Sequence, residues 1–334
     1  MRKILLSWLA AGAVVLLPAA ALADPLVIKF SHVVSPDTPK GLAIEYLKQQ
    51  VEQRSDGRLK VEVYPNSQLY KDKEEMEALQ LGAVQMLAPS LGKFRPLGVK
   101  EFDVFNLPFL FDGEGSVDKI TNGPIGKALL AKLAVRGIKG LGYWNSDFYV
   151  MTANKPLRTL EDFKGLRLRV QSSKVQSAEV EALGAMPQTL AFSEVYQALQ
   201  TGVIDGADYP GINNLFTQKV YEVQKYVTVS RHSYLGYGVI INKAFWDKLP
   251  PDLQQVVDVS LQDATEMNNK LVREESERSL KAMEASGKTT IIHLTDAERQ
   301  AWKKVLLPVH QKFVDDIGGD LLKAVYQDVG ITAP

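Results

Sequence analysis

The sequence predicts an α/β protein of two lobes, with two sheets flanked by helices and one long helix bridging the lobes. Three observations support this class. Strand and helix patterns alternate from the N-terminal part onward, one short segment recurs far along the chain, and a long run without Gly or Pro follows helical spacing. The length of 334 residues also suits about two domains with ample core.

The alternation begins close to the N-terminus. Residues Leu26–Val34 (LVIKFSHVV) are rich in β-branched and aromatic side chains, which predicts a strand that ends near His32. Residues 41–54 carry apolar side chains at helical spacing. Residues Leu59–Tyr64 (LKVEVY) alternate as in a half-buried strand. This strand–helix–strand order favours α/β layers with a largely parallel sheet.

One segment occurs twice. Residues 78–84 are ALQLGAV, and residues 198–204, which lie 120 positions later, are ALQTGVI. Each copy is typical of a helix end, a Gly in the left-handed position after it, and a short strand. Polar or aromatic residues follow both copies, at Pro89-Ser90 and at Asp208-Tyr209-Pro210. Because ligands of open α/β sheets bind at the carboxyl ends of strands, two such ends facing each other would form a cleft. Chance similarity between common helix endings is the alternative.

The later elements complete the second lobe and the bridge. Residues Leu166–Val170 (LRLRV) and Leu235–Ile241 (LGYGVII) predict two further strands, and the segment after them leads to a turn at Pro250-Pro251. Residues 252–286 contain neither Gly nor Pro and broadly follow a helical stripe. Such a helix would approach about 50 Å, long enough to brace two lobes. Two shorter helices with a kink are the alternative.

The first 23 residues are typical of an export signal. Arg2 and Lys3 precede an apolar run from Ile4 to Leu17, and Ala21-Leu22-Ala23 is an A-x-A cleavage site before Asp24. The apolar run is too short for a transmembrane helix. We therefore expect a signal peptide over residues 1–23, cleaved after Ala23, and a protein free in a bacterial periplasm. An uncleaved anchor is the alternative.

Composition and motifs exclude several classes of function. The absence of Cys excludes disulfides, thiolate metal sites and cysteine nucleophiles, and four His make a dense imidazole site improbable. A net charge of zero gives no sign of nucleic-acid binding. No phosphate-binding Gly loop, GxSxG or HExxH motif is present. The Glu74-Glu75 pair lies in a charged helical segment, which predicts a solvated face. We therefore predict no enzyme activity, no cofactor and no metal.

Arg169 is the residue that the pattern singles out. In the predicted strand Leu166–Val170, Arg167 and Arg169 share one face. Two Arg on a buried face would be costly unless paired. In one interpretation the strand places both at an exposed edge, or Arg169 pairs with a structural carboxylate. The alternative is that Arg169, nearest the carboxyl end, opens into the cleft and holds a ligand carboxylate with its planar fork.

Six segments of the chain form a recognisable set. They are 30–34 (FSHVV), 64–69 (YPNSQL), 89–94 (PSLGKF), 163–170 (FKGLRLRV), 191–202 (AFSEVYQALQTG) and 221–225 (YEVQK). Together they resemble the DctP-type solute-binding proteins of TRAP (tripartite ATP-independent periplasmic) transporters, and the resemblance covers nearly the whole chain after residue 23, in the family's order. The resemblance implies a type II-like periplasmic-binding-protein fold with two mixed sheets.

The same resemblance implies a receptor that closes on an organic acid and delivers it to the small and large membrane subunits of a TRAP permease. The ligand it implies is a C4-dicarboxylate such as malate, succinate or fumarate. It places the first lobe at residues 24–147 plus 235–262, and the second at 148–234 plus 263–334. We also expect a monomer. An organic-acid lyase and a sensor partner of the same fold are the rival functions.

The resemblance also carries individual residues over to this chain. Arg169 matches the family arginine that clamps the ligand carboxylate, and Phe192 matches an aromatic residue that packs on the ligand. The remaining matches lie on loops or turns that face the cleft. They are Ser90 and Lys93 in the first lobe, His32 after the first strand, Ser172 after Arg169, and His232 before the chain returns to the first lobe.

Three departures from the family pattern bear on specificity. Tyr149 stands where dicarboxylate binders often have Lys or Arg, Tyr209 lies in Asp-Tyr-Pro where Glu-Asn-Pro is usual, and Arg231 precedes His232 where Asn or Asp is common. The second carboxylate would then have lost one cationic partner, which Arg231 could replace. Alternatively, the ligand is an aromatic or keto monocarboxylate stacked on Tyr149 and Tyr209. In a third interpretation Tyr149 donates its hydroxyl and the ligand class is unchanged.

Overall fold

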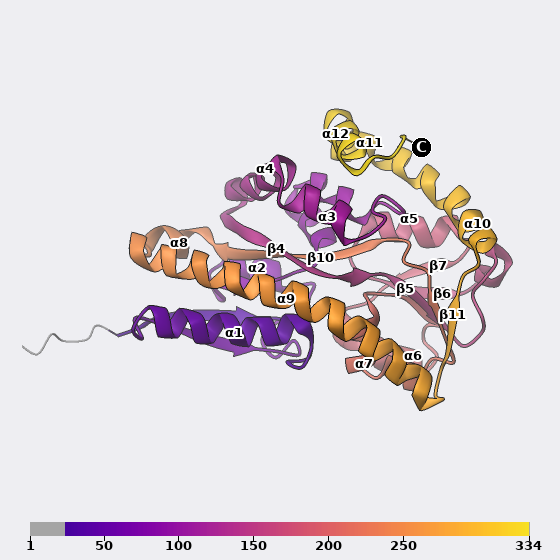
Figure 1. Cartoon of the computed structure of the whole chain (residues 1–334), viewed down its shortest axis with the longest axis horizontal. Coiled ribbons are helices and arrows are strands. Elements are labelled where there is room, and N and C mark those ends of the chain that lie inside the picture. The colour runs from indigo at the N-terminus through magenta and orange to yellow at the C-terminus, as the bar shows by residue number, and fades with distance from the viewer. Residues whose placement is uncertain (1–23, 334) are drawn as a thin grey trace, which may run out of the picture.

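A computed structural model describes residues 24–333 and contains two mixed sheets flanked by helices (Figure 1). The first sheet has five strands in the order β2-β1-β3-β10-β4, and the second has six in the order β11-β9-β5-β8-β6-β7. The strands are β1 Leu26–Ser31, β2 Leu59–Tyr64, β3 Met86–Leu87, β4 Ile138–Phe148, β5 Val150–Ala153, β6 Arg167–Val170, β7 Met186–Thr189, β8 Gly206–Tyr209, β9 Tyr226–Val229, β10 Tyr234–Asn242 and β11 Thr290–His293. The predicted signal peptide and its cleavage site lie outside the described residues.

Helices cover both sheets. The α-helices are α1 Pro39–Arg54, α2 Glu75–Gln80, α3 Glu114–Thr121, α4 Pro124–Lys132, α5 Lys174–Ala182, α6 Val195–Gln200, α7 Ile212–Thr217, α8 Lys243–Lys248, α9 Pro251–Ser286, α10 Asp296–Leu306, α11 Val314–Ile317 and α12 Gly319–Val329. Short 3₁₀ helices are η1 Leu91–Leu97, η2 Lys100–Asn106, η3 Leu133–Arg136, η4 Leu160–Phe163, η5 Phe192–Glu194, η6 Val220–Glu222 and η7 Leu307–Phe313. No helix between residues 24 and 333 combines the length and apolar character needed to cross a membrane.

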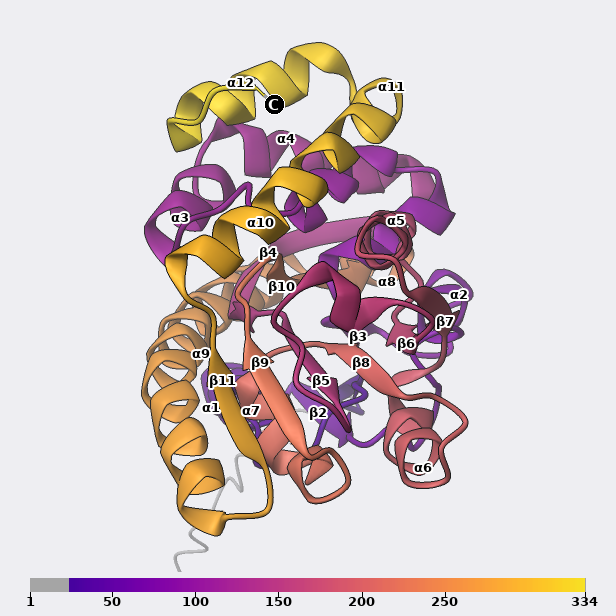
Figure 2. The ribbon, with the colours of Figure 1, turned by 90° about the vertical axis from the view of Figure 1, so that its right-hand side faces the viewer.

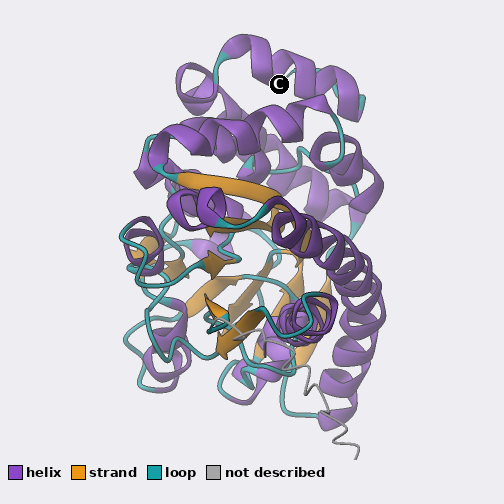
Figure 3. Cartoon of the chain, turned by 90° about the vertical axis from the view of Figure 1, so that its left-hand side faces the viewer, coloured by secondary structure: helices purple, strands orange, loops and turns teal. Residues whose placement is uncertain are grey.

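The predicted N-terminal elements are confirmed. β1 and β2 pair in parallel and α1 connects them, so the first unit is a strand–helix–strand crossover. β3 adds to β1 in parallel, whereas β10 returns antiparallel between β3 and β4. The sheet is therefore mixed, because β10 arrives from the far lobe rather than through a local crossover. Figure 3 shows this end of the molecule, with helices around the strands.

The recurring segment marks equivalent structure in both lobes. The first copy ends α2 and places Gly82 at φ 77° before β3, and the second ends α6 and places Gly202 at φ 69° before β8. Glycine suits both turns because a left-handed backbone strains residues that carry a Cβ. Figure 2 shows β8 in the second sheet with α6 at its edge.

The predicted long helix is one continuous element. α9 spans 36 residues without a break, so the alternative of two shorter helices is wrong. Its first half packs Leu253, Val257 and Leu261 into the core of the first sheet. Its second half contributes Met283 to the core around β8 and α7. α9 therefore contacts both lobes along its length (Figure 1).

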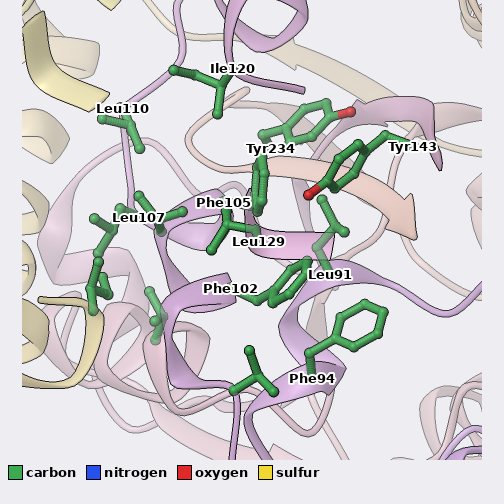
Figure 4. Packing of buried hydrophobic residues seen from close by; sticks show 14 of the residues in the cluster. Leu91, Phe94, Phe102, Phe105, Leu107, Leu110, Ile120, Leu129, Tyr143 and Tyr234 are labelled. Carbon is green, nitrogen blue, oxygen red and sulfur yellow. The ribbon is translucent and has the colours of Figure 1, made fainter. Parts of the chain in front are cut away.

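A large aromatic core lies on the other face of the first sheet. Phe94 and Phe102 stack with ring centroids 4.4 Å apart, and Phe105 packs against Tyr143 (Figure 4). Leu322 and other apolar residues of α12 join this core, beside α3. The C-terminal helices thus lie against the helices of the first sheet. The limits of the two lobes remain a prediction.

The junction of β5 and β8 leaves no room for a side chain at Gly206, which gives the first prediction. A Cβ there would lie 2.0 Å from the Thr152 carbonyl oxygen, a backbone atom of the neighbouring strand. We expect Gly206→Ala to lower the free energy of unfolding by about 1–3 kcal/mol, as overpacking does. Urea denaturation followed by circular dichroism measures this loss.

The matched control is Gly115→Ala in α3, where an added Cβ meets no atom within 4 Å. This control should leave stability unchanged or raise it by up to about 1 kcal/mol, because Ala favours a helix over Gly. Equal stability of the two variants would contradict the packing seen at Gly206.

Candidate functional site

A cavity of about 370 Å³ lies where the two sheets approach each other. The first lobe contributes residues from the start of α1, from α2 and from the loop after β3, and the second contributes the ends of β6 and the start of η5. The loop after β3 and the residues after β6 both lie at the carboxyl ends of their strands, which is the position at which open α/β sheets bind ligands.

Arg169 lines this cavity from the second lobe and is 2% exposed. β6 lies between β7 and β8, so the strand's inner position buries the side chain. Its Nε and Nη2 atoms both donate to the Leu190 carbonyl oxygen at 3.2 Å. Arg167 instead is half-exposed and pairs with Asp205 at 2.9 Å. Among residues 24–333, Arg169 has no carboxylate within 4.0 Å, so its charge is not neutralised by an ion pair.

A buried ion pair closes the cavity on the first-lobe side. Lys93 Nζ lies 2.5 Å from Asp72 Oδ2 and also donates to the Asp72 carbonyl oxygen at 3.0 Å. Asp72 Oδ1 accepts a hydrogen bond from the Phe192 backbone N–H at 3.2 Å, across the two lobes. Burial alone would raise the pKa of Asp72, but the charge and hydrogen bond of Lys93, with the charge of Arg169, hold it below its usual range. Asp72 is therefore ionised.

Lys40 also faces the cavity, from the start of α1. Its Nζ donates to the Ala88 carbonyl oxygen at 3.1 Å and lies 3.7 Å from the centre of the Tyr237 ring. Burial lowers the pKa of Lys40 to about 7; Lys93 adds to this effect, and Glu75 and Asp72 oppose it. Glu75 lines the cavity too, and burial raises the pKa of its carboxyl group. The cavity thus contains three basic groups and one firmly ionised carboxylate, a balance that suits an anion.

Four of the predicted site residues meet in the cavity: Arg169, Phe192, Ser90 and Lys93. Ser90 Oγ donates to Gln171 Oε1 at 2.6 Å, a second hydrogen bond across the lobes. The centroid of the Phe192 ring lies 6.1 Å from that of the Tyr209 ring, so the two side chains pack together.

Three others are buried beside the cavity but are not among its lining residues. Tyr209 ends β8, and Tyr149 lies between β4 and β5 with its hydroxyl unpartnered. Burial raises the pKa of Tyr149 well above its usual value, Asp208 adds to this effect, and Arg169 opposes it. His32 is buried after β1, where burial and the charge of Lys40 lower its pKa to about 3. The imidazole is therefore neutral at physiological pH.

Ser172 and Arg231 lie elsewhere. Ser172 lines a separate surface hollow together with Arg95 and Lys174. Arg231 is 47% exposed; its Nη1 lies 3.6 Å from Asp147 Oδ1, and its guanidinium lies over the Phe148 ring. The structure thus does not place Arg231 among the residues around the cavity, and Lys40 is the additional cation there.

His232 belongs to a buried cluster with Glu179 and Asp208. Its Nε2 lies 3.4 Å from Asp208 Oδ1 and 4.0 Å from Glu179 Oε2, and its Nδ1 lies 2.7 Å from Ser230 Oγ. One ligand atom from each of the three lies within 4.8 Å of the others, so this group could reach a single metal ion. Burial raises the pKa of Glu179 well above its usual value, and Asp208 raises it further. A proton on Glu179 therefore neutralises part of the cluster.

Several cavity residues were not predicted from the sequence, and the prediction for Glu75 was wrong. Glu75 is 3% exposed, not solvated, because α2 turns this face toward Lys40 and Lys93 while Glu74 points outward. Gln171 directly follows the strand that carries Arg169, so the rule of carboxyl strand ends could have found it. Lys40 also had a signal, since a cation in the first turn of a helix opposes the helix dipole.

Comparison with known proteins identifies a family and relatives along nearly the whole chain. The family model for bacterial extracellular solute-binding protein, family 7 (DctP) matches residues 30–316. The chain is 54% identical over 325 residues to the C4-dicarboxylate-binding periplasmic protein DctP of Rhodobacter capsulatus, covering 97% of each protein. These matches confirm the resemblance noted in the sequence. The names are those of binding proteins, which also confirms the prediction that the chain is not an enzyme.

Solved structures confirm the two-lobed fold. A TRAP periplasmic solute-binding protein from Shewanella oneidensis with bound succinate matches with a TM-score of 0.89 and 41% identity, over 91% of this chain and 99% of that one. Another, from Pseudomonas aeruginosa PAO1 with bound L-malate, matches with a TM-score of 0.83 and 38% identity, over 86% of this chain and 100% of that one.

The buried cluster predicts a pH-dependent stability. Glu179 has an ordinary pKa of about 4.3 in the unfolded chain and a raised pKa when folded. At a pH between these two values, Glu179 is protonated in the folded state and ionised in the unfolded state. The free energy of unfolding of the wild type therefore falls as the pH rises. Glu179→Gln keeps the acceptor for Ser233 Oγ and removes this loss. Relative to the wild type, we expect it to gain up to about 1.4 kcal/mol per pH unit as the pH rises from the ordinary pKa of a Glu toward the raised pKa of the folded state.

Urea denaturation at each pH measures this difference. Glu181→Gln is the control, because Glu181 lies on the same helical segment but is exposed, and its difference from the wild type should stay flat. A Glu179→Gln curve that runs parallel to the wild type across this pH range would show that the buried carboxyl group does not carry the proton.

Proposed function

The chain belongs to family 7 of the bacterial extracellular solute-binding proteins, and on this premise we propose that it captures a C4-dicarboxylate such as succinate or malate and delivers it to a TRAP permease. The observation that carries the proposal is the buried guanidinium of Arg169, which lines a cavity between the lobes and has no carboxylate within 4.0 Å among residues 24–333. Relatives support the ligand class, since their names or bound ligands are C4-dicarboxylates.

Arg169 provides the site for one ligand carboxylate. Two of its nitrogen atoms are fixed on the Leu190 carbonyl oxygen, which orients the guanidinium plane and leaves other N–H groups for the ligand. A carboxylate bound to a planar guanidinium makes short, charge-assisted hydrogen bonds. Because the pair would be desolvated, it would be stronger here than at the surface.

Binding is coupled to lobe closure. The Ser90–Gln171 and Asp72–Phe192 hydrogen bonds join the lobes directly around the cavity. Such neutral or partly charged bonds each contribute about 1 kcal/mol, so they hold a closed state only weakly. A bound anion adds contacts to both lobes that exist only when they are closed. The ligand thereby shifts the population toward the closed form, which is the form a permease can distinguish.

The alternative ligand, an aromatic or keto monocarboxylate, has less support. It depends on stacking against Tyr149 and Tyr209, yet neither ring is among the cavity-lining residues. The excess of basic groups in the cavity also suits a ligand with more than one negative charge. A periplasmic location follows from the family, and cleavage after Ala23, a monomeric state and the permease partner remain predictions.

Native mass spectrometry of the purified protein, followed by denaturing extraction of any bound molecule, tests the ligand class. We expect a C4-dicarboxylate, recovered chemically unchanged. Isothermal titration with succinate and L-malate then measures affinity. An aromatic or keto monocarboxylate as the extracted molecule, together with no binding of succinate or malate, would contradict the proposal.

Arg169 gives a sharper test. We expect Arg169→Ala to weaken succinate binding by about 30-fold or more, because removing the partner of a buried charge costs roughly 2–5 kcal/mol. Arg231→Ala removes the same kind of charge from an exposed side chain outside the cavity and should change affinity by less than about threefold. Similar affinities for wild type and Arg169→Ala would show that Arg169 is not the clamp.

A further inference from the structure

Lys40 occupies an unfavourable position for a cation. It is the second residue of α1, whose first turn contains no acidic side chain, and it is 4% exposed. The N-terminus of a helix carries a partial positive charge, so a lysine there is destabilised by the dipole. Burial adds a second penalty, because the charged form loses its hydration. An anion beside the Lys40 ammonium group would offset both penalties.

The protein supplies no such anion in direct contact. Within residues 24–333, the Lys40 ammonium group makes one hydrogen bond to a backbone carbonyl and one contact with the Tyr237 ring, and it has no carboxylate within 4.0 Å. An ammonium group has three N–H donors, so its hydrogen-bonding capacity is not used up. Asp72, the ionised carboxylate of the cavity, is already held by Lys93.

Lys40 and Arg169 approach the same cavity from different lobes. Lys40 comes from α1, which packs on the first sheet, whereas Arg169 comes from β6 of the second sheet. Both line the space of about 370 Å³. A ligand with a carboxylate at each end can therefore contact a cation from each lobe.

We propose that Lys40 binds the second carboxylate of a dicarboxylate whose first carboxylate is held by Arg169, and that this contact selects dicarboxylates over monocarboxylates. The inference rests on the proposed function, since it requires the cavity to bind an organic acid. A monocarboxylate held by Arg169 makes no ionic contact with Lys40, so it lacks the stabilisation that a second carboxylate gains there, and this difference favours the dicarboxylate. The second cation of the site is thus Lys40 and not Arg231.

Succinate and butyrate make the direct comparison, because both have four carbons and only succinate has the second carboxylate. Isothermal titration of the wild type and Lys40→Met should show succinate binding weakened by about 30-fold or more and butyrate binding unchanged within about threefold. The succinate-to-butyrate preference therefore falls. Lys48→Met, which removes a lysine of the same helix outside the cavity, should keep both affinities.

A second measurement uses the wild type alone and does not depend on a variant's folding. The charged or titratable groups that face Lys40 are Glu75, Asp72, Lys93, His32 and Tyr237. With a pKa of about 7, Lys40 is mostly neutral at pH 8, and an adjacent carboxylate would restore its proton. Titrations at pH 8 in buffers of different ionisation enthalpy should show uptake approaching about one proton with succinate and clearly less with butyrate.

The outcomes separate the two proposals. If Lys40→Met keeps the wild-type preference for succinate, or proton uptake is equal for the two ligands, the role of Lys40 is wrong while the Arg169-dependent receptor stands. If the wild type binds neither succinate nor L-malate, the proposed function itself fails. Lys40→Arg keeps the charge and should retain the preference, which separates charge from packing.

Discussion

Arg169 and Lys40 line one cavity, and neither has a carboxylate within ion-pair distance among the described residues. Taking such a charge out of water costs several kcal/mol even after the protein relaxes. An anion bound beside Arg169 offsets this cost and so stabilises the closed arrangement of the lobes. This constraint turns a two-lobed α/β protein into a receptor, because it makes the closed state depend on the ligand.

The rest of the architecture serves to bring those two charges together. β4 continues into β5 through Tyr149, and β9 continues into β10 through residues 230–233, so two strand connections cross between the sheets. α9 contacts the first sheet near Leu253 and the second lobe near Met283. These three links keep the carboxyl ends of β3 and β6 facing each other. The side chains at those ends can then act on one ligand.

A second group of buried ionisable side chains reduces its net charge in a different way. Glu179, Asp208 and His232 are fully buried, but they are near one another and Ser233 donates a hydrogen bond to Glu179. Here burial shifts a pKa so that a proton reduces the net charge. The ligand cavity cannot use that route for Arg169, since a guanidinium does not lose its proton in proteins. The charge of Arg169 is therefore neutralised by an anionic ligand that enters from solvent, as a binding site for anions requires.

The sequence by itself determined the class, the main elements and part of the site. Local patterns depend on neighbouring residues, so the strands at 26–31 and 59–64, the helix at 251–286 and the glycines at 82 and 202 were predictable, and family motifs pointed to Arg169. Only the tertiary structure decided which charges share the cavity. Glu75 and Lys40 belong to segments that are polar in sequence, and their burial depends on where α2 and α1 place them, at the cavity between the lobes. Arg231 was predicted near the ligand but is exposed, because the connection between β9 and β10 places it outside the cavity. Burial and charge pairing arise from residues far apart in the chain, and no local pattern contains them.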